Sequence, residues 1–141
     1  MAQARILCAV LPHLIAEQKE VLEPTHAVTY VVTLEEARRV LASSTFDLIV
    51  CGVHFDDCQM PLLLHHCKAD SRHAKLPFVC IRGYRGGLPD STYLQIKNAA
   101  TLLGGVYVDL REWIDMRGYM AALAMLRTLI AKLLTPEGVR S

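Results

Sequence analysis

The sequence has few aromatic residues and no excess charge of either sign. Phe, Trp and Tyr make up 6% of its 141 residues, and 15 Lys and Arg are balanced by 14 Asp and Glu, for a formal net charge of +1. A chain so close to neutrality has no overall field that would attract nucleic acid or an acidic membrane surface. We therefore expect neither nucleic acid nor a membrane as a partner of this chain.

Long hydrophobic runs and signs of disulfide pairing are also lacking. No stretch reaches the ~18 apolar residues that a membrane span requires. Pro12 and His13 interrupt the apolar run at 6–15 and no small-residue cleavage site follows it, so we interpret the run as a buried strand and not as a leader. Five cysteines, an odd number, favour reduced thiols and a cytoplasmic location.

The size and composition are typical of one globular domain. Apolar residues make up 52% and charged residues 21% of the chain. A chain of this length buries roughly 68–70% of its unfolded surface, so it can fold without a metal, a disulfide or a cofactor. We predict a single domain over residues 1–141, with a core from about residue 5 to residue 134 and a tail at 135–141.

Short apolar runs alternate with helical patterns along the chain. Strands are predicted at 6–11, 29–32, 46–53, 77–81 and 106–108, and a helical pattern follows each, the last ending near residue 134. Thr33 and Glu36 predict a capping box, and Gly104 and Gly105 predict a helix end with one residue in the left-handed conformation. The alternation predicts an α/β fold with one doubly wound, five-stranded parallel sheet and helices on both faces.

Three of these segments resemble strands three, four and five of response-regulator receiver (CheY-like) domains, which serve bacterial two-component systems. They are FDLIVCG at 46–52, LPFVCIRG at 76–83 and LGGVYV at 103–108, and the resemblance extends from about residue 5 to residue 134. It implies a sheet with strand order 2-1-3-4-5. In such folds the functional residues lie at the C-terminal ends of the strands.

The positions at which receivers carry their phosphorylation residues hold other residues here. The resemblance places the acidic pair on Val10 and Leu11, the phospho-accepting aspartate on Gly52, the hydroxyl residue on Arg82 and the lysine near Asp109. Phosphoryl transfer to a carboxylate needs that nucleophile and a Mg²⁺ ion held by oxygen ligands. We therefore predict a non-phosphorylatable pseudo-receiver that is not an enzyme and carries no cofactor or metal.

Other polar residues are expected near the same edge. Asp56 and Asp57 follow the third strand, and we interpret them as the start of a solvated loop and not as replacement ligands. We expect Arg82 to lie in the vacated acidic pocket and to pair with Asp56, Asp57 or Asp109. His13 and His54 follow strands one and three, and we expect them to line a polar pocket.

Two other functions remain open from the sequence. Arg82 and Arg85 lie in a glycine-rich loop that ends at Gly87, where guanidinium and backbone N–H groups could hold an anion, which would make the chain a small-ligand or anion sensor. A metal-dependent sensor is the weaker alternative, because the ligand types of the segment 51–73 show no CxxC or HxxxH spacing. Those residues are Cys51, His54, Cys58, His65, His66, Cys67 and His73.

The last helix is apolar nearly all round, which is typical of a helix buried on two sides. We expect one face to cover the sheet, comprising Tyr119, Leu123, Leu126, Ile130 and Leu133. That leaves Met116, Met120, Ala122, Met125 and Leu129 without an evident core. The resemblance agrees, because receivers commonly dock partners through their fourth and fifth helices and fifth strand. We predict a homodimer or another protein contact centred on Met116, Met120, Met125 and Leu129, unless the Trp113 segment folds back over them.

Overall fold

The computed structural model describes residues 3–84 and 86–135 and contains one five-stranded sheet. Its strands are β1 (Arg5–Ala9), β2 (Ala27–Val31), β3 (Leu48–Gly52), β4 (Phe78–Arg82) and β5 (Val106–Asp109). They lie in the order β2-β1-β3-β4-β5, and every pairing is parallel. The predicted fold class and strand order are confirmed.

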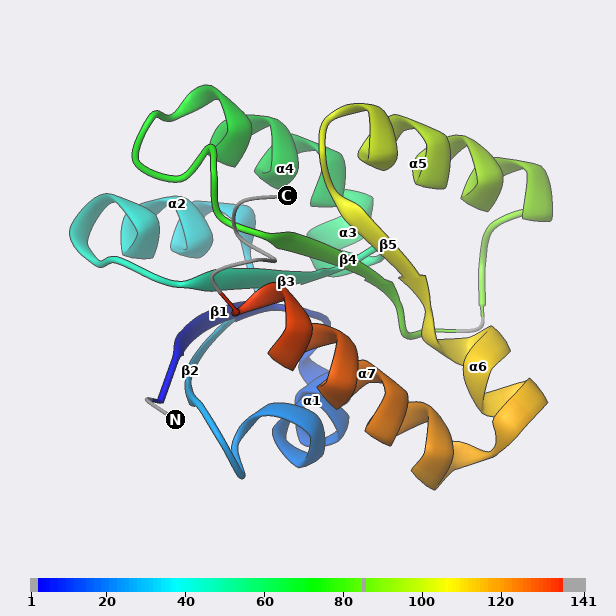
Figure 1. The fold of residues 1–141 in the computed structure, drawn as a ribbon. Helices are drawn as coiled ribbons and strands as arrows, with labels where there is room; N and C mark the ends of the chain where they lie inside the picture. The colour runs from blue at the N-terminus through cyan, green and yellow to red at the C-terminus, as the bar shows by residue number, and fades with distance from the viewer. Residues whose placement is uncertain (1–2, 85, 136–141) are drawn as a thin grey trace.

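Helices cover both faces of the sheet (Figure 1). One face carries α2 (Leu34–Ser43), α4 (Met60–Ala69) and α5 (Asp90–Leu102), and the other carries α1 (Ile15–Leu22) and α7 (Tyr119–Leu133). A 3₁₀ turn, η1 (Pro12–Leu14), precedes α1. In the part of the chain that the structure describes, no helix is long and apolar enough to cross a membrane.

The sheet separates two hydrophobic cores, because successive side chains of a strand point to opposite faces. Leu7 and Ala9 of β1 pack on the side of α2 and α4, whereas Ile6 and Cys8 pack on the side of α1 and α7. All five residues of β3 are buried, as expected for a central strand covered on both faces. This burial accounts for the continuous apolar run that marked the strand in the sequence.

The helix boundaries follow local signals. Thr33 Oγ1 accepts a hydrogen bond from the Glu36 N–H (3.1 Å), which confirms the predicted cap of α2. The Glu36 side chain accepts from the N–H of Val32 (3.0 Å), one residue before the position that a standard capping box uses. Gly104 follows α5 with φ +88°, the predicted left-handed residue at a helix end.

The last helical region is divided into two helices, which the sequence pattern did not predict. A separate helix α6 (Leu110–Arg117) follows β5, and Gly118 (φ 90°, ψ 160°) separates it from α7. Only glycine adopts such a backbone conformation readily. The Asp109 side chain caps α6 by accepting from the Glu112 N–H (3.0 Å).

The turn after β3 holds three consecutive non-glycine residues in the left-handed region. Asp56, Asp57 and Cys58 have φ values of 45°, 59° and 60° within the short element α3 (Phe55–Cys58). Asp56 Oδ2 accepts from the Leu34 N–H at the start of α2 (2.7 Å), and the Gln59 amide donates to the Asp56 carbonyl (2.8 Å). The expectation that Asp56 is solvated is therefore wrong, whereas Asp57 is exposed as expected.

We expect Asp57→Gly to stabilise the protein by about 1 kcal/mol, because glycine removes the cost of a left-handed backbone at an exposed position. The matched control is Gln95→Gly in the exposed middle of α5, which should destabilise by roughly 0.5–1 kcal/mol through lost helix propensity. Urea unfolding of both variants measures the effect. A destabilised Asp57→Gly variant would contradict a left-handed turn at this position.

Candidate functional site

The structure brings the predicted phosphorylation positions to one edge of the sheet and fills part of that edge with apolar atoms. Val10 follows β1, Gly52 ends β3, and Val10 is only 2% exposed. A Cβ atom built on Gly52 would lie 3.6 Å from Val10 Cγ1. Leu11 is half-buried next to the turn η1. Neither a nucleophile nor an oxygen ligand for Mg²⁺ is available from these three residues.

Arg82 and Asp109, at the ends of the neighbouring strands β4 and β5, form an ion pair. They are cross-strand partners, and Arg82 Nη1 donates to Asp109 Oδ2 at 3.2 Å with side chains 20% and 19% exposed. The guanidinium also stacks over the ring of Tyr93 of α5, 3.7 Å from its centroid. Partial burial lowers the pKa of Arg82, but the Asp109 carboxylate outweighs this and raises it overall. The predicted neutralisation of Arg82 by a carboxylate is confirmed, with Asp109 as the partner.

The position of the guanidinium differs from the expected one. Gly52 pairs with Ile81 in the sheet register, so the next residue, Arg82, points to the opposite face. Arg82 accordingly turns toward Tyr93 of α5, whereas the space beside Gly52 is bounded by Val10. The space beside Gly52 is thus bounded by an apolar side chain that follows the neighbouring strand β1, and the arginine does not occupy it.

A directed hydrogen-bond chain holds the loop between β4 and α5. The Tyr93 hydroxyl donates to the Gly86 carbonyl (2.8 Å), so the His54 Nε2–H must donate to the Tyr93 oxygen (2.7 Å). His54 Nδ1 is then an acceptor for the Cys58 thiol at 3.6 Å. Partial burial and the charge of Arg82 lower the pKa of His54, which favours the neutral imidazole that this hydrogen-bond arrangement requires.

Tyr84 lies between the two histidines that the sequence placed at this edge. Its ring makes edge-on contacts with His13 (5.5 Å between centroids) and with His54 (5.2 Å). His13 and His54 therefore do not line an open polar pocket together. Sequence reasoning missed the roles of Tyr84 and Tyr93; their places in and just after the glycine-rich loop were the only available signal.

The histidine and cysteine of this edge form a poor nucleophilic pair. Partial burial and the neighbouring Asp57 raise the pKa of Cys58, so its thiol remains protonated. The pair has no adjacent carboxylate that orients the imidazole, because His54 donates to Tyr93. The hydrogen bonds of His54 therefore hold the loop in place, and His54 does not activate the Cys58 thiol as a nucleophile.

The ligands of the metal hypothesis are not assembled in the described part of the chain. Within residues 3–84 and 86–135, no group of three or more His, Cys, Asp or Glu side chains is placed to hold a metal ion. Cys51, Cys67 and Cys80 are buried, and burial raises the pKa of Cys67 and Cys80 to about 12. These thiols act as small apolar side chains.

Only one of the two arginines in the anion hypothesis lies in the described part of the chain. Arg85 lies outside the described residues, and the guanidinium of Arg82 already has Asp109 as its partner and Tyr93 as its platform.

The predicted interface residues do not form one patch. Met116 and Met120 are 68% and 71% exposed near the α6–α7 junction, whereas Met125 (37% exposed) and the half-buried Leu129 line a hollow beside Trp113 of α6. Met120 and Leu129 lie on opposite sides of α7, because nine residues span two and a half helical turns. Trp113 does fold back toward the Met125 side, as the alternative prediction proposed.

The face of α7 that covers the sheet also differs from the predicted one. Leu123, Leu126 and Ile130 are buried as expected, but Tyr119 is 38% exposed and Ala122 is fully buried. Tyr119 is the first residue of α7 and directly follows Gly118, whereas Ala122, one turn later, already packs in the core.

Comparison with known proteins identifies the fold. No protein-family model and no curated protein sequence matches this chain. Among solved structures, it is similar to the phosphorylated cyanobacterial phytochrome response regulator RcpA (15% identity, 94% of each chain, TM-score 0.67) and to the chemotaxis response regulator CheY4 of Vibrio cholerae (14%, 90% of this chain and 98% of that one, 0.65). A putative response regulator from Chloroflexus aurantiacus aligns with 18% identity over 87% of this chain and 99% of that one, with a TM-score of 0.61. The chain has the fold of response-regulator receiver domains.

Proposed function

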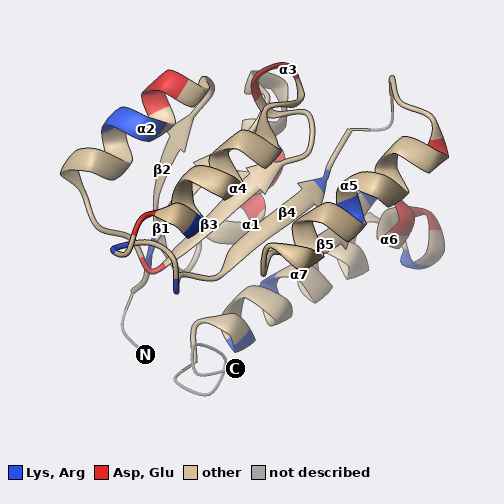
Figure 2. Cartoon of the chain, turned by 90° about the horizontal axis from the view of Figure 1, so that it is seen from above, with Lys and Arg blue, Asp and Glu red and all other residues tan. Residues whose placement is uncertain are grey.

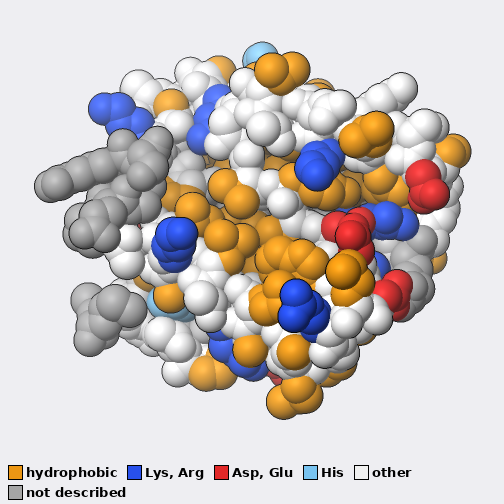
Figure 3. Space-filling view, turned by 45° about the vertical axis from the view of Figure 1, so that its right-hand side comes forward, with side chains coloured by type: hydrophobic (Ala, Val, Ile, Leu, Met, Phe, Trp, Pro, Cys, Tyr) orange, Lys and Arg blue, Asp and Glu red, His pale blue; other side chains and the backbone are white. Residues whose placement is uncertain are grey.

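We propose that this chain is a non-phosphorylatable, non-enzymatic receiver-like module that acts in signalling by binding another protein chain. The observation that carries the proposal is a partly apolar face formed by α5, β5, α6 and α7. Figure 3 shows hydrophobic side chains gathered on this face between α5 and α7, with charged side chains around them. An exposed apolar area of this kind on a globular domain typically marks an interface.

Two hollows on this face share Trp113. One, of about 490 Å³, lies between α5, β5 and α6 and is lined by Leu94, Tyr107 and Trp113 among others. The second, of about 390 Å³, is lined by Trp113, Met125 and Leu129. Leu94 is 58% exposed. The second hollow, with Trp113 and the adaptable Met125, is suited to receive an apolar anchor from a partner, whereas the first is lined mainly by charged and tyrosine side chains and offers polar contacts.

The distribution of charge supports a protein partner. Figure 2 shows few charged residues along α7 and residues of both signs on α6. The lining of the larger hollow mixes Arg82 and Lys97 with Asp90, Asp109 and Glu112, so no single sign dominates. The face thus combines an apolar hollow with a neighbouring hollow of mixed charge, and protein interfaces typically contain both apolar and polar areas.

A second copy of the chain is the first partner to test. We expect the mean mass in light scattering to rise with concentration, and Met125→Glu to abolish the rise, because a carboxylate cannot be desolvated at low cost in the interface. Leu62→Glu on α4, 52% exposed and on the other side of the sheet, is the matched control and should leave the rise unchanged. A monomer at every concentration, or equal effects of the two substitutions, would remove self-association through this face.

We expect no phosphorylation of this chain by small phosphodonors. Gly52 has no nucleophile, and the carboxylate of Asp56, a few residues away, is occupied by the N–H of Leu34. After incubation with acetyl phosphate and Mg²⁺, the intact mass should be unchanged. A hydroxylamine-labile adduct on Asp56 or Asp57 would contradict the proposed loss of phosphorylation.

A further inference from the structure

A hollow on the surface of α2 and α4 is not used by the proposed function. It has a volume of about 580 Å³ and is lined by Arg38 of α2, by Leu62, His65 and His66 of α4, and by Asp70 and Ser71 after α4. Helices α2 and α4 lie side by side over one face of the sheet, whereas α7 covers the other (Figure 1). None of the residues that line it belongs to the two hollows beside Trp113, so it is separate from the area that we propose as the protein interface.

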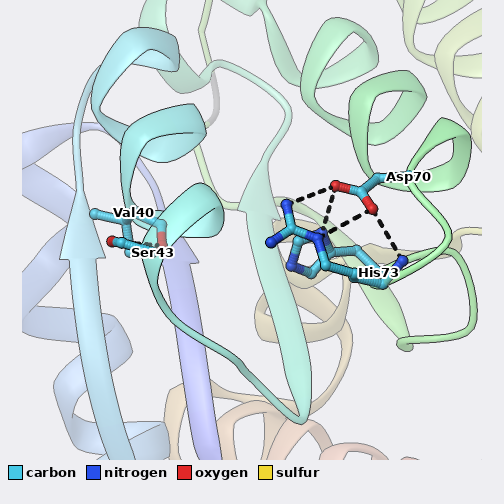
Figure 4. Close-up of polar contacts among 5 residues, drawn as sticks. Val40, Ser43, Asp70 and His73 are labelled. Carbon is cyan, nitrogen blue, oxygen red and sulfur yellow. Dashed lines mark hydrogen bonds and ion pairs between the residues drawn. The ribbon is translucent and has the colours of Figure 1, made fainter.

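The carboxylate in this hollow is already engaged. Asp70 accepts from the backbone N–H of Arg72 (2.9 Å) and from its guanidinium Nη2 (3.1 Å), and it lies 3.2 Å from Nδ1 of the buried His73 (Figure 4). The hydrogen bonds from Arg72 hold the pKa of Asp70 well below its usual range. The negative charge of Asp70 is thus compensated locally by groups of the same turn.

The basic groups of the hollow remain available. Among the described residues, the side chains of Arg38, His65 and His66 have no hydrogen-bond or ion-pair partner. Partial burial lowers the pKa of His66, and the charges of Arg38, His73 and Arg72 lower it further against the opposing effect of Asp70. Arg38 on α2 and His66 on α4 thus line the same hollow, and their charges interact.

We infer that the hollow between α2 and α4 binds a phosphate monoester, with Arg38, His65 and His66 as its donors. A guanidinium group presents a planar pair of donors to an oxyanion, and two imidazoles add N–H donors from the adjoining helix. A phosphate monoester offers three acceptor oxygens and a charge of about −1.5 to −2 at neutral pH, which matches three cationic or potentially cationic groups better than a single carboxylate does. The exposed Leu62 adds apolar surface for the group that carries the phosphate.

Binding is linked to proton uptake. A bound phosphate dianion favours the imidazolium form of His66, so the affinity should rise as the pH falls toward about 6, below which protonation of the phosphate itself offsets the gain. The groups that face this imidazole are Arg38 on α2 and Asp70, Arg72 and His73 in the turn after α4. Of these, Arg38 and Arg72 remain charged over the same pH range, and the pairing of Asp70 keeps it ionised.

The test uses the full chain and NMR of the histidine rings and backbone amides. Three probes are titrated: inorganic phosphate, a phosphoserine peptide, and the same peptide with serine. We expect shifts at His65 and His66 with at least one phosphorylated probe and none with the serine peptide. Shifts with inorganic phosphate identify a small anion as sufficient, and shifts with the phosphopeptide alone show that the peptide contributes.

Two matched variants decide whether the binding is specific. Arg38→Gln should weaken it about tenfold, as expected for the loss of a charged hydrogen-bond donor, whereas Arg39→Gln on the neighbouring exposed position should leave it unchanged. Absence of shifts with both phosphorylated probes would overturn the inference. Equal weakening by the two variants would also overturn it, because that result indicates non-specific attraction to surface charge.

Discussion

Replacing Gly52 by aspartate is expected to destabilise the protein by about 2–4 kcal/mol at pH 7 and not to create a phosphorylation site. The new side chain would lie against Val10 Cγ1, 3.6 Å from its Cβ atom, and Val10 is buried. The atoms nearest its Cβ are those of Val10 and the Ala9 carbonyl oxygen, none of which donates a hydrogen bond, and burying a carboxylate in such surroundings has a desolvation cost of this order. The ion pair of Arg82 lies on the opposite face of the sheet, so it cannot compensate the new charge.

The stability that Gly52→Asp loses is expected to increase as the pH rises. Desolvation raises the folded-state pKa of the new carboxyl above its unfolded value of about 3.9. Below that pH the group is protonated in both states and the charge contributes no cost. As the pH rises through the interval between the two pKa values, the unfolded state loses its proton first, and the variant becomes progressively less stable than the parent chain.

Two substitutions at the same position serve as controls, and urea unfolding at pH 4 and pH 7 measures all of them. Gly52→Ala should be nearly neutral, because its Cβ has ordinary contacts. Gly52→Asn matches the size of aspartate without its charge, so its effect should not change between the two pH values. An aspartate variant as stable as the parent at pH 7, or one that accepts a phosphoryl group from acetyl phosphate, would show that the edge is more open than the structure indicates.

Replacing Asp109 by alanine is expected to cost about 2–3 kcal/mol, because this side chain stabilises two elements. Its Oδ2 atom pairs with Arg82, and its Oδ1 atom accepts from the Glu112 N–H at the start of α6. Loss of a helix cap costs about 1 kcal/mol. The remaining cost, about 1–2 kcal/mol, comes from a guanidinium that is only 20% exposed and loses its counter-charge.

Asp109→Asn separates the two contributions. Asparagine can still accept from the Glu112 N–H, so this variant should lose only the charge pairing and retain about 1 kcal/mol more stability than the alanine variant. Urea unfolding at neutral pH gives the comparison. Equal stabilities of the two variants would mean that the cap contributes nothing, and a neutral alanine variant would contradict the ion pair as a stabilising feature.

The elements of the fold were predictable because they depend on local patterns. The apolar run at 48–52 is buried on both faces, and Thr33 caps α2 as its position before Glu36 predicted. The order of the strands came from the resemblance to receivers, since periodicity alone identifies a strand without naming its neighbours. The extra helix α6 was missed, although Asp109 and Gly118 mark its two ends in the sequence.

Much less of the candidate site followed from the sequence. Its amino acids at Val10, Gly52 and Arg82 were assigned to the C-terminal edge, where the structure places them. The directions of their side chains could not be predicted from the sequence, because the direction at a strand end depends on the register with the next strand. A shift of a single position reverses the direction: Ile81 faces the same side as Gly52, whereas the next residue, Arg82, faces the other.

The sequence by itself determined the type and succession of strands and helices and the absence of a nucleophile at Gly52, because each of these is a property of residues close together in the chain. Only the tertiary structure decided that Asp56 caps α2, that Tyr93 connects His54 to Gly86, and that Met120 and Leu129 face different surroundings. Such contacts join residues up to 39 positions apart, as for His54 and Tyr93. Their free energy depends on distances and directions that arise only when the helices are packed on the sheet.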